Sequence, residues 1–264
     1  MESSSFYVTL PSNASMDVYP DNTASTYTIH MPKTIYLKET YEVGLAEIQY
    51  PHSWRTFNNE RDFNVFVSYD NPVTTQVYFP RGYYKSIPDL INELNKAIDR
   101  ELQDDDEEWK IKFIYNKFTR KVRVQLKEHC RLRLTQGLAN VLGFNPTLPT
   151  YFGHQEDITV FFGEYQSDIY NGFYTLYVYC SLCEPQIVGD SYVPLLRTVG
   201  VQGQDGDVII KAYGEPQYIP VSTNKFDTIE INIKNDVGEA VSFGAGKVIC
   251  KLHFRPKWKH QPFT

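Results

Sequence analysis

The sequence predicts a mainly β protein, built as an antiparallel sandwich or barrel with one helix, and three observations support this. Many short segments alternate apolar and polar residues with a period of two, which is typical of strands that bury one face. Turns rich in Pro, Gly, Asn and Asp separate these segments at short intervals. Tyr and Phe are abundant, at 20 and 16 residues, and aromatic side chains pack well on pleated sheets.

The region 226–255 shows this alternation most clearly. The isoleucines at 229, 231 and 233 alternate with polar residues, and so do the apolar residues at 248, 250, 252 and 254. The loop between the two runs is too long for a two-residue hairpin turn. The two strands are therefore either joined by a wide loop or placed in facing sheets, and the second arrangement is typical of a sandwich.

The N-terminal part contains three further strand segments, at 6–10, 27–31 and 41–50. In the last of these the apolar positions change from odd to even numbers beside Gly44, which predicts a β-bulge. Two more strands are expected at 63–69 and 75–79.

One helix is expected over 86–102, where apolar residues recur at helical spacing. Ser86 and Asp89 have the spacing of a capping box at its start. A hairpin rich in basic residues follows, with its turn at 116–119. The helix and hairpin predict an insertion at 80–145 within one domain that spans 1–264, because no repeat or linker divides the chain in two.

Composition limits the function classes. The chain has 264 residues and a net charge of −6, which argues against a generally nucleic-acid-binding surface. No apolar run approaches the roughly 20 residues of a membrane span, so no membrane contact is expected. The first residues lack the pattern of a signal peptide, and we therefore expect the four cysteines to be reduced thiols.

No motif indicates catalysis or a resident metal or cofactor. Cys180 and Cys183 form a C-x-x-C pair, but the second pair that a zinc site needs is missing. Gly244 to Lys247 resembles the tail of a phosphate-binding loop, yet Val248 stands where Ser or Thr is required. We therefore predict no catalytic, cofactor-binding or metal-binding residue. A pair of carboxylates of the glycosidase type stays open at this point.

A basic segment is the strongest candidate for a charged ligand. Basic residues alternate there with aromatic ones, a combination that can bind nucleic acid. The alternative is a solvated face whose cations pair with the acidic run at 104–108. The candidate residues are Lys117, Arg120, Lys121, Arg123 and Arg131.

Five stretches taken in order resemble a known family. They are YEVGLAEIQYPHSW at 41–54, GYYKSIPDLIN at 82–92, LANVLGF at 138–144, EPQIVGD at 184–190 with VPLLR at 193–197, and the region 226–255. Together they resemble the minor capsid, or penton, protein of Maverick/Polinton elements, which are large virus-like DNA transposons of eukaryotic genomes. The resemblance extends over nearly the whole chain.

The resemblance implies a single jelly-roll sandwich that assembles as a homopentamer at icosahedral vertices. It also implies contact with the double jelly-roll major capsid protein, a place in the virion, and synthesis and assembly inside a eukaryotic host cell. No enzymatic activity and no cofactor are expected. The basic segment adds a weak contact with packaged DNA.

A five-fold ring needs a heterologous interface, in which one surface of a copy meets a different surface of the next. Two aromatic-rich loops are candidates for these surfaces, and the alternative is that they pack over the ends of the core. The other function considered is a jelly-roll carbohydrate-binding module or glycoside hydrolase, and a third is a domesticated capsid descendant with a new role. The candidate interface residues are Trp54, Arg55, Phe57, Gln186, Asp190 and Arg197.

Overall fold

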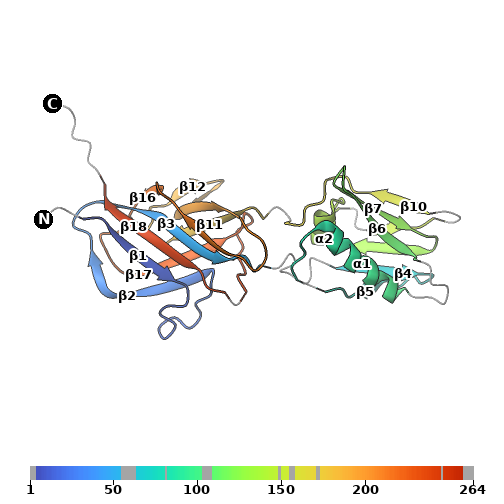
Figure 1. The fold of residues 1–264 in the computed structure, drawn as a ribbon, viewed down its shortest axis with the longest axis horizontal. Helices are drawn as coiled ribbons and strands as arrows, with labels where there is room; N and C mark the ends of the chain where they lie inside the picture. Colours follow the sequence, from blue (N-terminus) through green and yellow to red (C-terminus); the bar gives the residue numbers. More distant parts are fainter. Residues whose placement is uncertain are drawn as a thin grey trace, which may run out of the picture. The chain divides into compact units, whose positions relative to one another are not determined.

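The chain folds into two compact units, which are described separately (Figure 1). The computed structural model describes residues 4–54, 64–80, 82–102, 109–147, 150–154, 158–170, 173–244 and 246–257. Unit 1 combines residues 1–54 with 173–264, and unit 2 comprises residues 55–172.

Unit 1 contains two principal antiparallel sheets. Sheet A has the strand order β1 (Phe6–Pro11), β18 (Ile249–Pro256), β3 (Tyr41–Pro51) and β15 (Val208–Ala212), and β16 (Tyr218–Pro220) also pairs with β3. Sheet B has the order β14 (Leu195–Gly200), β11 (Thr175–Cys180), β17 (Lys225–Lys234) and β2 (Thr26–Tyr36).

The chain path through these sheets is that of a jelly-roll. The chain passes from β1 in sheet A to β2 in sheet B and back to β3, and later from β14 in sheet B to β15 in sheet A, to β17 and to β18. Such repeated crossing between two antiparallel sheets is the jelly-roll arrangement. The predicted single jelly-roll is confirmed, and β17 and β18 lie in different sheets, the second of the two arrangements considered.

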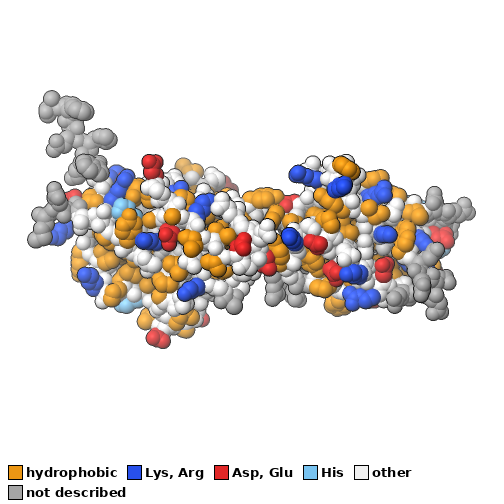
Figure 2. All heavy atoms as spheres, viewed as in Figure 1, with side chains coloured by type: hydrophobic (Ala, Val, Ile, Leu, Met, Phe, Trp, Pro, Cys, Tyr) orange, Lys and Arg blue, Asp and Glu red, His pale blue; other side chains and the backbone are white. Residues whose placement is uncertain are grey.

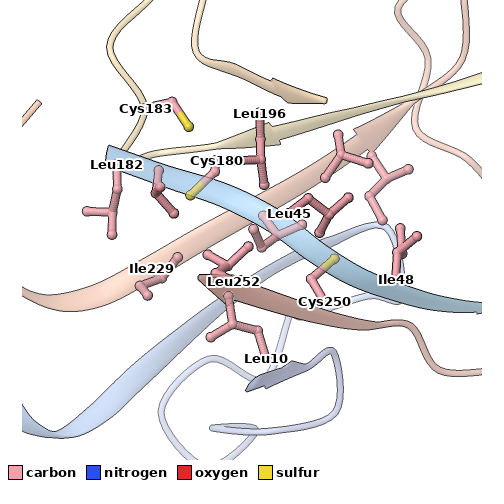
Figure 3. Close-up of a cluster of buried hydrophobic side chains, with 14 of the residues drawn as sticks. Leu10, Leu45, Ile48, Cys180, Leu182, Cys183, Leu196, Ile229, Cys250 and Leu252 are labelled. Atoms are coloured by element: carbon pink, nitrogen blue, oxygen red, sulfur yellow. The ribbon is translucent and has the colours of Figure 1, made fainter. Parts of the chain in front are cut away.

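Alternating residues from both sheets build the core of unit 1 (Figure 3). Leu45, Ile48 and Leu252 from sheet A are fully buried with Ile229 from sheet B. The register between β18 and β3 shifts between Lys251 and Leu252, where β3 carries an extra residue. The extra residue is Ala46, so the predicted β-bulge is present two positions after Gly44, and it explains why the apolar phase of β3 changes.

Unit 2 has two sheets and two helices. Sheet C has the order β5 (Thr75–Val77), β4 (Val65–Tyr69), β8 (Cys130–Leu134) and β9 (Thr150–Phe152), and sheet D has the order β10 (Thr159–Phe162), β7 (Lys121–Leu126) and β6 (Ile111–Asn116). The helices are α1 (Ile87–Glu101) and α2 (Gln136–Leu142).

Helix α1 supplies much of the core of unit 2. Its buried face includes Leu90, Leu94 and Ile98, which join apolar residues of both sheets in a cluster separate from that of unit 1. The helix begins after Ser86, whose Oγ accepts a hydrogen bond from the Asp89 N–H at 3.4 Å. The helix expected over 86–102 is therefore present with the expected capping residue.

The unit boundaries differ from the expected insertion at 80–145, which lies within unit 2. Strand β4 pairs with β8 from Val65 opposite Leu134 to Tyr69 opposite Cys130, so strands on both sides of α1 complete one sheet. Alternation marks β4 as a strand but does not reveal its partner, which lies more than 60 residues further along the chain. The segment between β3 and β11 is therefore a compact unit with its own core.

Candidate assembly surfaces

Trp54 lies in the core of unit 1, with 5% of its surface exposed. Its ring stacks on His52 with centroids 4.0 Å apart, and Phe173 meets it edge-on at 5.2 Å. The His52 N–H donates to the Asp207 carbonyl at 2.8 Å, which fixes the end of β3. Of the two alternatives considered for this loop, Trp54 therefore follows the second: it packs over the end of the core. Arg55 and Phe57 lie outside the described residues.

Arg197 spans the open edge between the two sheets of unit 1. Its guanidinium carbon lies 3.6 Å from the ring centroid of Tyr213, which follows β15 in sheet A, while Arg197 itself belongs to β14 in sheet B. Burial raises the pKa of Tyr213, and the positive charge of Arg197 opposes this shift. The contact is an internal cation–π interaction that joins the two edge strands.

The candidates Gln186 and Asp190 lie on a separate hairpin formed by β12 (Gln186–Val188) and β13 (Ser191–Val193). Gln186 Nε2 donates to the Leu195 carbonyl, which ties the hairpin to β14, and Asp190 is exposed in the two-residue turn. Ile187 and Tyr192 face each other across the hairpin and are 82% and 72% exposed. We call these two side chains the hairpin pair.

A groove runs beside this hairpin over the outer face of sheet B. Its volume is about 710 Å³, and its walls come from the hairpin and from the loop after β17. Tyr177 and Tyr179 of β11 line its floor, and Lys234 Nζ lies 5.9 Å from the Tyr179 ring centroid. Three acidic residues also line it: Asp190, Glu230 and Asp236.

The outer face of sheet A carries an apolar stripe along its edge strand β15. Val208 and Ile210 are 60% and 63% exposed and lie opposite Pro51 and Gln49 of β3. Ile249 of β18 lies on the other side of Gln49 and is half-buried. We call Val208, Ile210, Pro51 and Ile249 the β15 stripe.

A polar network occupies the other end of the same face. The Tyr218 hydroxyl and His253 Nδ1 lie 2.6 Å apart, and Arg255 lies 3.5 Å from the Tyr218 ring centroid while its Nη2 pairs with Glu42 at 3.1 Å. Burial first, and then the charge of Arg255, lower the pKa of His253. Both effects disfavour the positively charged form of His253.

All five basic candidates lie in unit 2, and four of them lie close together on sheet D. Lys117 and Arg120 are in the turn between β6 and β7, and Lys121 and Arg123 are on β7. Arg131 lies apart on β8 in sheet C, where its guanidinium is 5.6 Å from the Phe152 ring centroid. The five predicted basic residues are therefore divided between sheets C and D.

All four cysteine thiols are free and buried (Figure 3 shows Cys180, Cys183 and Cys250). Burial raises the pKa of Cys130 to about 11 and that of Cys250 to about 12. The hydrogen bond with Cys180, followed by burial, also raises the pKa of Cys183. The hydrogen bond with Cys183 lowers the pKa of Cys180, although burial opposes this shift. Because a thiolate is the reactive form, the thiols of Cys130, Cys183 and Cys250 are poor nucleophiles.

Neither a metal centre nor a membrane helix is found in the part of the chain that the structure describes. No three His, Cys, Asp or Glu side chains among those residues are placed to hold an ion. No helix within the described ranges is long and apolar enough to cross a bilayer.

Comparison with solved structures identifies the fold. The crystal structure of the mavirus penton protein covers 96% of this chain and 99% of its own, with a TM-score of 0.50 and 11% sequence identity. This chain has the fold of the mavirus penton protein. A chain of the Sputnik virophage structure, determined by cryo-EM at 3.5 Å, covers 96% and 98% with a TM-score of 0.45 and 11% identity. No protein-family model and no curated protein matches the sequence.

The penton-type fold expected from the five stretches is therefore confirmed, and at 96% coverage the match includes both units. Sequence reasoning missed the hairpin pair and the β15 stripe. A signal for the hairpin was present, because Gly189 and Asp190 between two apolar runs form a favoured hairpin turn with Gly189 at φ +61°. The stripe had a weaker signal, the uninterrupted run Val208, Ile209 and Ile210 on an edge strand.

Proposed function

We propose that this chain is a structural capsid protein, a penton that forms the five-fold vertices of a virus-like particle. The observation that carries the proposal is the end-to-end match with the mavirus penton protein, which extends over jelly-roll and inserted unit alike. The four thiols are buried, and three of them have a raised pKa, which agrees with a structural role without enzymatic activity.

The proposed ring brings the hairpin pair of one copy onto the β15 stripe of the next. A closed ring requires two different surfaces on one chain, and these two differ in shape and in sequence. A two-stranded hairpin is marginally stable alone. Burial of the exposed side chains of Ile187 and Tyr192 against a neighbouring copy would therefore stabilise the hairpin. Val208 and Ile210 offer such an apolar surface beside an unpaired strand edge.

Gln186 and Asp190 stay in this proposed interface because they flank the hairpin pair. Trp54 and Arg197 are left out of it because both make internal contacts in unit 1. Contact with a major capsid protein, a place in the virion and assembly within a eukaryotic host cell complete the proposal.

The test replaces one residue on each surface and measures mass by analytical ultracentrifugation. The wild-type chain of 30.7 kDa should sediment as a species of about five copies, and Tyr192→Asp or Ile210→Asp should sediment as a monomer with an unchanged circular dichroism spectrum. Val18→Asp, which changes another exposed valine of unit 1, is the matched control and should remain assembled.

The outcomes separate two errors. A wild-type chain that stays monomeric at all concentrations, alone and with the major capsid protein, refutes the penton function. A wild-type pentamer that is unaffected by both substitutions refutes only the assignment of the two surfaces.

The groove beside the hairpin favours carbohydrate binding as a second candidate function. Its two tyrosines and three acidic residues are of the types that bind sugars by ring stacking and hydrogen bonding. Isothermal titration with neutral oligosaccharides tests it: a monomer that binds one of them, and loses binding in Tyr177→Ala, would favour this function over the capsid role.

A further inference from the structure

The outer face of sheet D is a continuous surface of unit 2. Phe113, Val122 and Val124 point into the core and are at most 1% exposed, so the alternate residues of β6 and β7 point outward. The strand registers place Ile114, Arg123 and Phe162 side by side in one row across the three strands. A second row contains Lys112, Gln125 and Val160.

This face is strongly basic although the whole chain is acidic. The segment 109–127, which contains β6 and β7, has no Asp or Glu. Among the described residues, Lys117, Arg120 and Arg123 form no ion pair, and Lys121 Nζ donates to the neutral carbonyl of Glu164 at 2.8 Å. The basic residues of this face are Lys112, Lys117, Arg120, Lys121, Arg123 and Lys127. Lys110 of the same segment is buried, with its Nζ 4.5 Å from the ring centroid of Tyr69 in sheet C.

Two aromatic rings stand in the midst of these charges. Phe118 is 87% exposed and Phe162 is 66% exposed, although large aromatic side chains usually lose more of their surface on folding. Together with Lys117, Lys121 and Arg123 they line a hollow of about 560 Å³ at the β6–β7 turn. Figure 2 shows blue basic side chains among orange apolar ones over the part of unit 2 that contains β6 and β7.

We propose that this face binds single-stranded nucleic acid. Lys117, Lys121 and Arg123 would contact the phosphates, and unpaired bases would stack on Phe118 and Phe162. The exposed rings of Phe118 and Phe162 favour single-stranded nucleic acid over other negatively charged ligands. An acidic peptide or a sulfated glycan would neutralise the cations but leave both rings in water, and the bases of a duplex are already stacked on one another. The inference is independent of the penton function.

The test uses the full chain and a fluorescent oligonucleotide of twenty thymidines, with binding measured by anisotropy between 50 and 200 mM salt. We expect the logarithm of the binding constant to fall with that of salt concentration, with a slope of about −0.7 for each phosphate contact. Phe118→Ala and Phe162→Ala should each weaken binding about tenfold with little change in that slope. Arg123→Gln and Lys117→Gln should each make the slope less negative by about 0.7.

The matched controls are Tyr78→Ala and Lys85→Gln, which change an exposed aromatic and an exposed cation elsewhere in unit 2 and should leave binding unchanged. No binding at 50 mM salt with 100 µM protein overturns the proposal. Equally tight binding of heparin, poly-glutamate or a 20-base-pair duplex, together with full binding by both Phe variants, shows a general polyanion surface and also overturns it. Circular dichroism checks that each variant is folded.

Discussion

Replacing Trp54 by Ala separates a core residue from an interface residue. Trp54 is 5% exposed and packs against His52, Phe173 and Phe243, so the substitution removes a buried indole at the point where β3 leaves the sandwich. Truncating a buried Trp to Ala costs about 3–5 kcal/mol in the free energy of unfolding. Domains commonly have a total of about 5–15 kcal/mol, so unit 1 would lose a large share of its stability.

The assay is urea unfolding followed by far-ultraviolet circular dichroism, in an Ile210→Asp background so that assembly does not contribute. Hydrogen exchange read by mass spectrometry assigns the loss to a unit: peptides from β3 and β11 should lose protection, and peptides from α1 should not. The control is Tyr192→Ala, which removes an exposed aromatic and should change the free energy by no more than about 0.5 kcal/mol. Two results together would refute the core assignment: an unchanged free energy of unfolding for Trp54→Ala in the Ile210→Asp background, and loss of the pentamer when Trp54→Ala is the only substitution.

Three further predictions concern local chemistry. Gly143→Ala should destabilise unit 2 by more than the roughly 1–2 kcal/mol expected for Gly206→Ala, as measured by urea unfolding, because both have positive φ but only at Gly143 would a Cβ overlap the Tyr165 carbonyl oxygen. Because the pKa of His253 is lowered in the folded state, its contribution to stability should be complete above the usual pKa of about 6.5 and decline as the pH falls through that value; His253→Gln should lose less stability between pH 7.5 and 5. A thiol reagent at pH 8 should label neither Cys130 nor Cys250 in the native chain, whose pKa values are about 11 and 12, and should label both in urea, as counted by mass spectrometry.

Local patterns predicted the elements well. The alternation of Ile229, Ile231 and Ile233 indicates a strand with one buried face, and all three are fully buried in sheet B. Ser86 and the apolar spacing after it located α1 to within one residue at either end. Such patterns can be read from a short window of sequence, because they depend only on the residues next to one another along the chain.

Pairing and burial in loops were harder to predict. Nothing near Val65 in the sequence indicates that its partner is Leu134, so the extent of unit 2 did not follow from alternation. From sequence alone, an aromatic residue in a loop can belong either to the core or to an interface. For Trp54 the structure distinguishes the two, because the rings of His52, Phe173 and Phe243 surround it. For the same reason the exposure of Ile187 and Tyr192 had to come from the structure.

The central claim is that copies of this chain meet through two different surfaces of the jelly-roll to close a ring of five. Native mass spectrometry of the purified full-length chain tests it most directly. The penton account predicts a dominant species of five times 30.7 kDa that disappears in Tyr192→Asp. A dominant dimer or an open-ended series of oligomers, in place of one closed species, would contradict it.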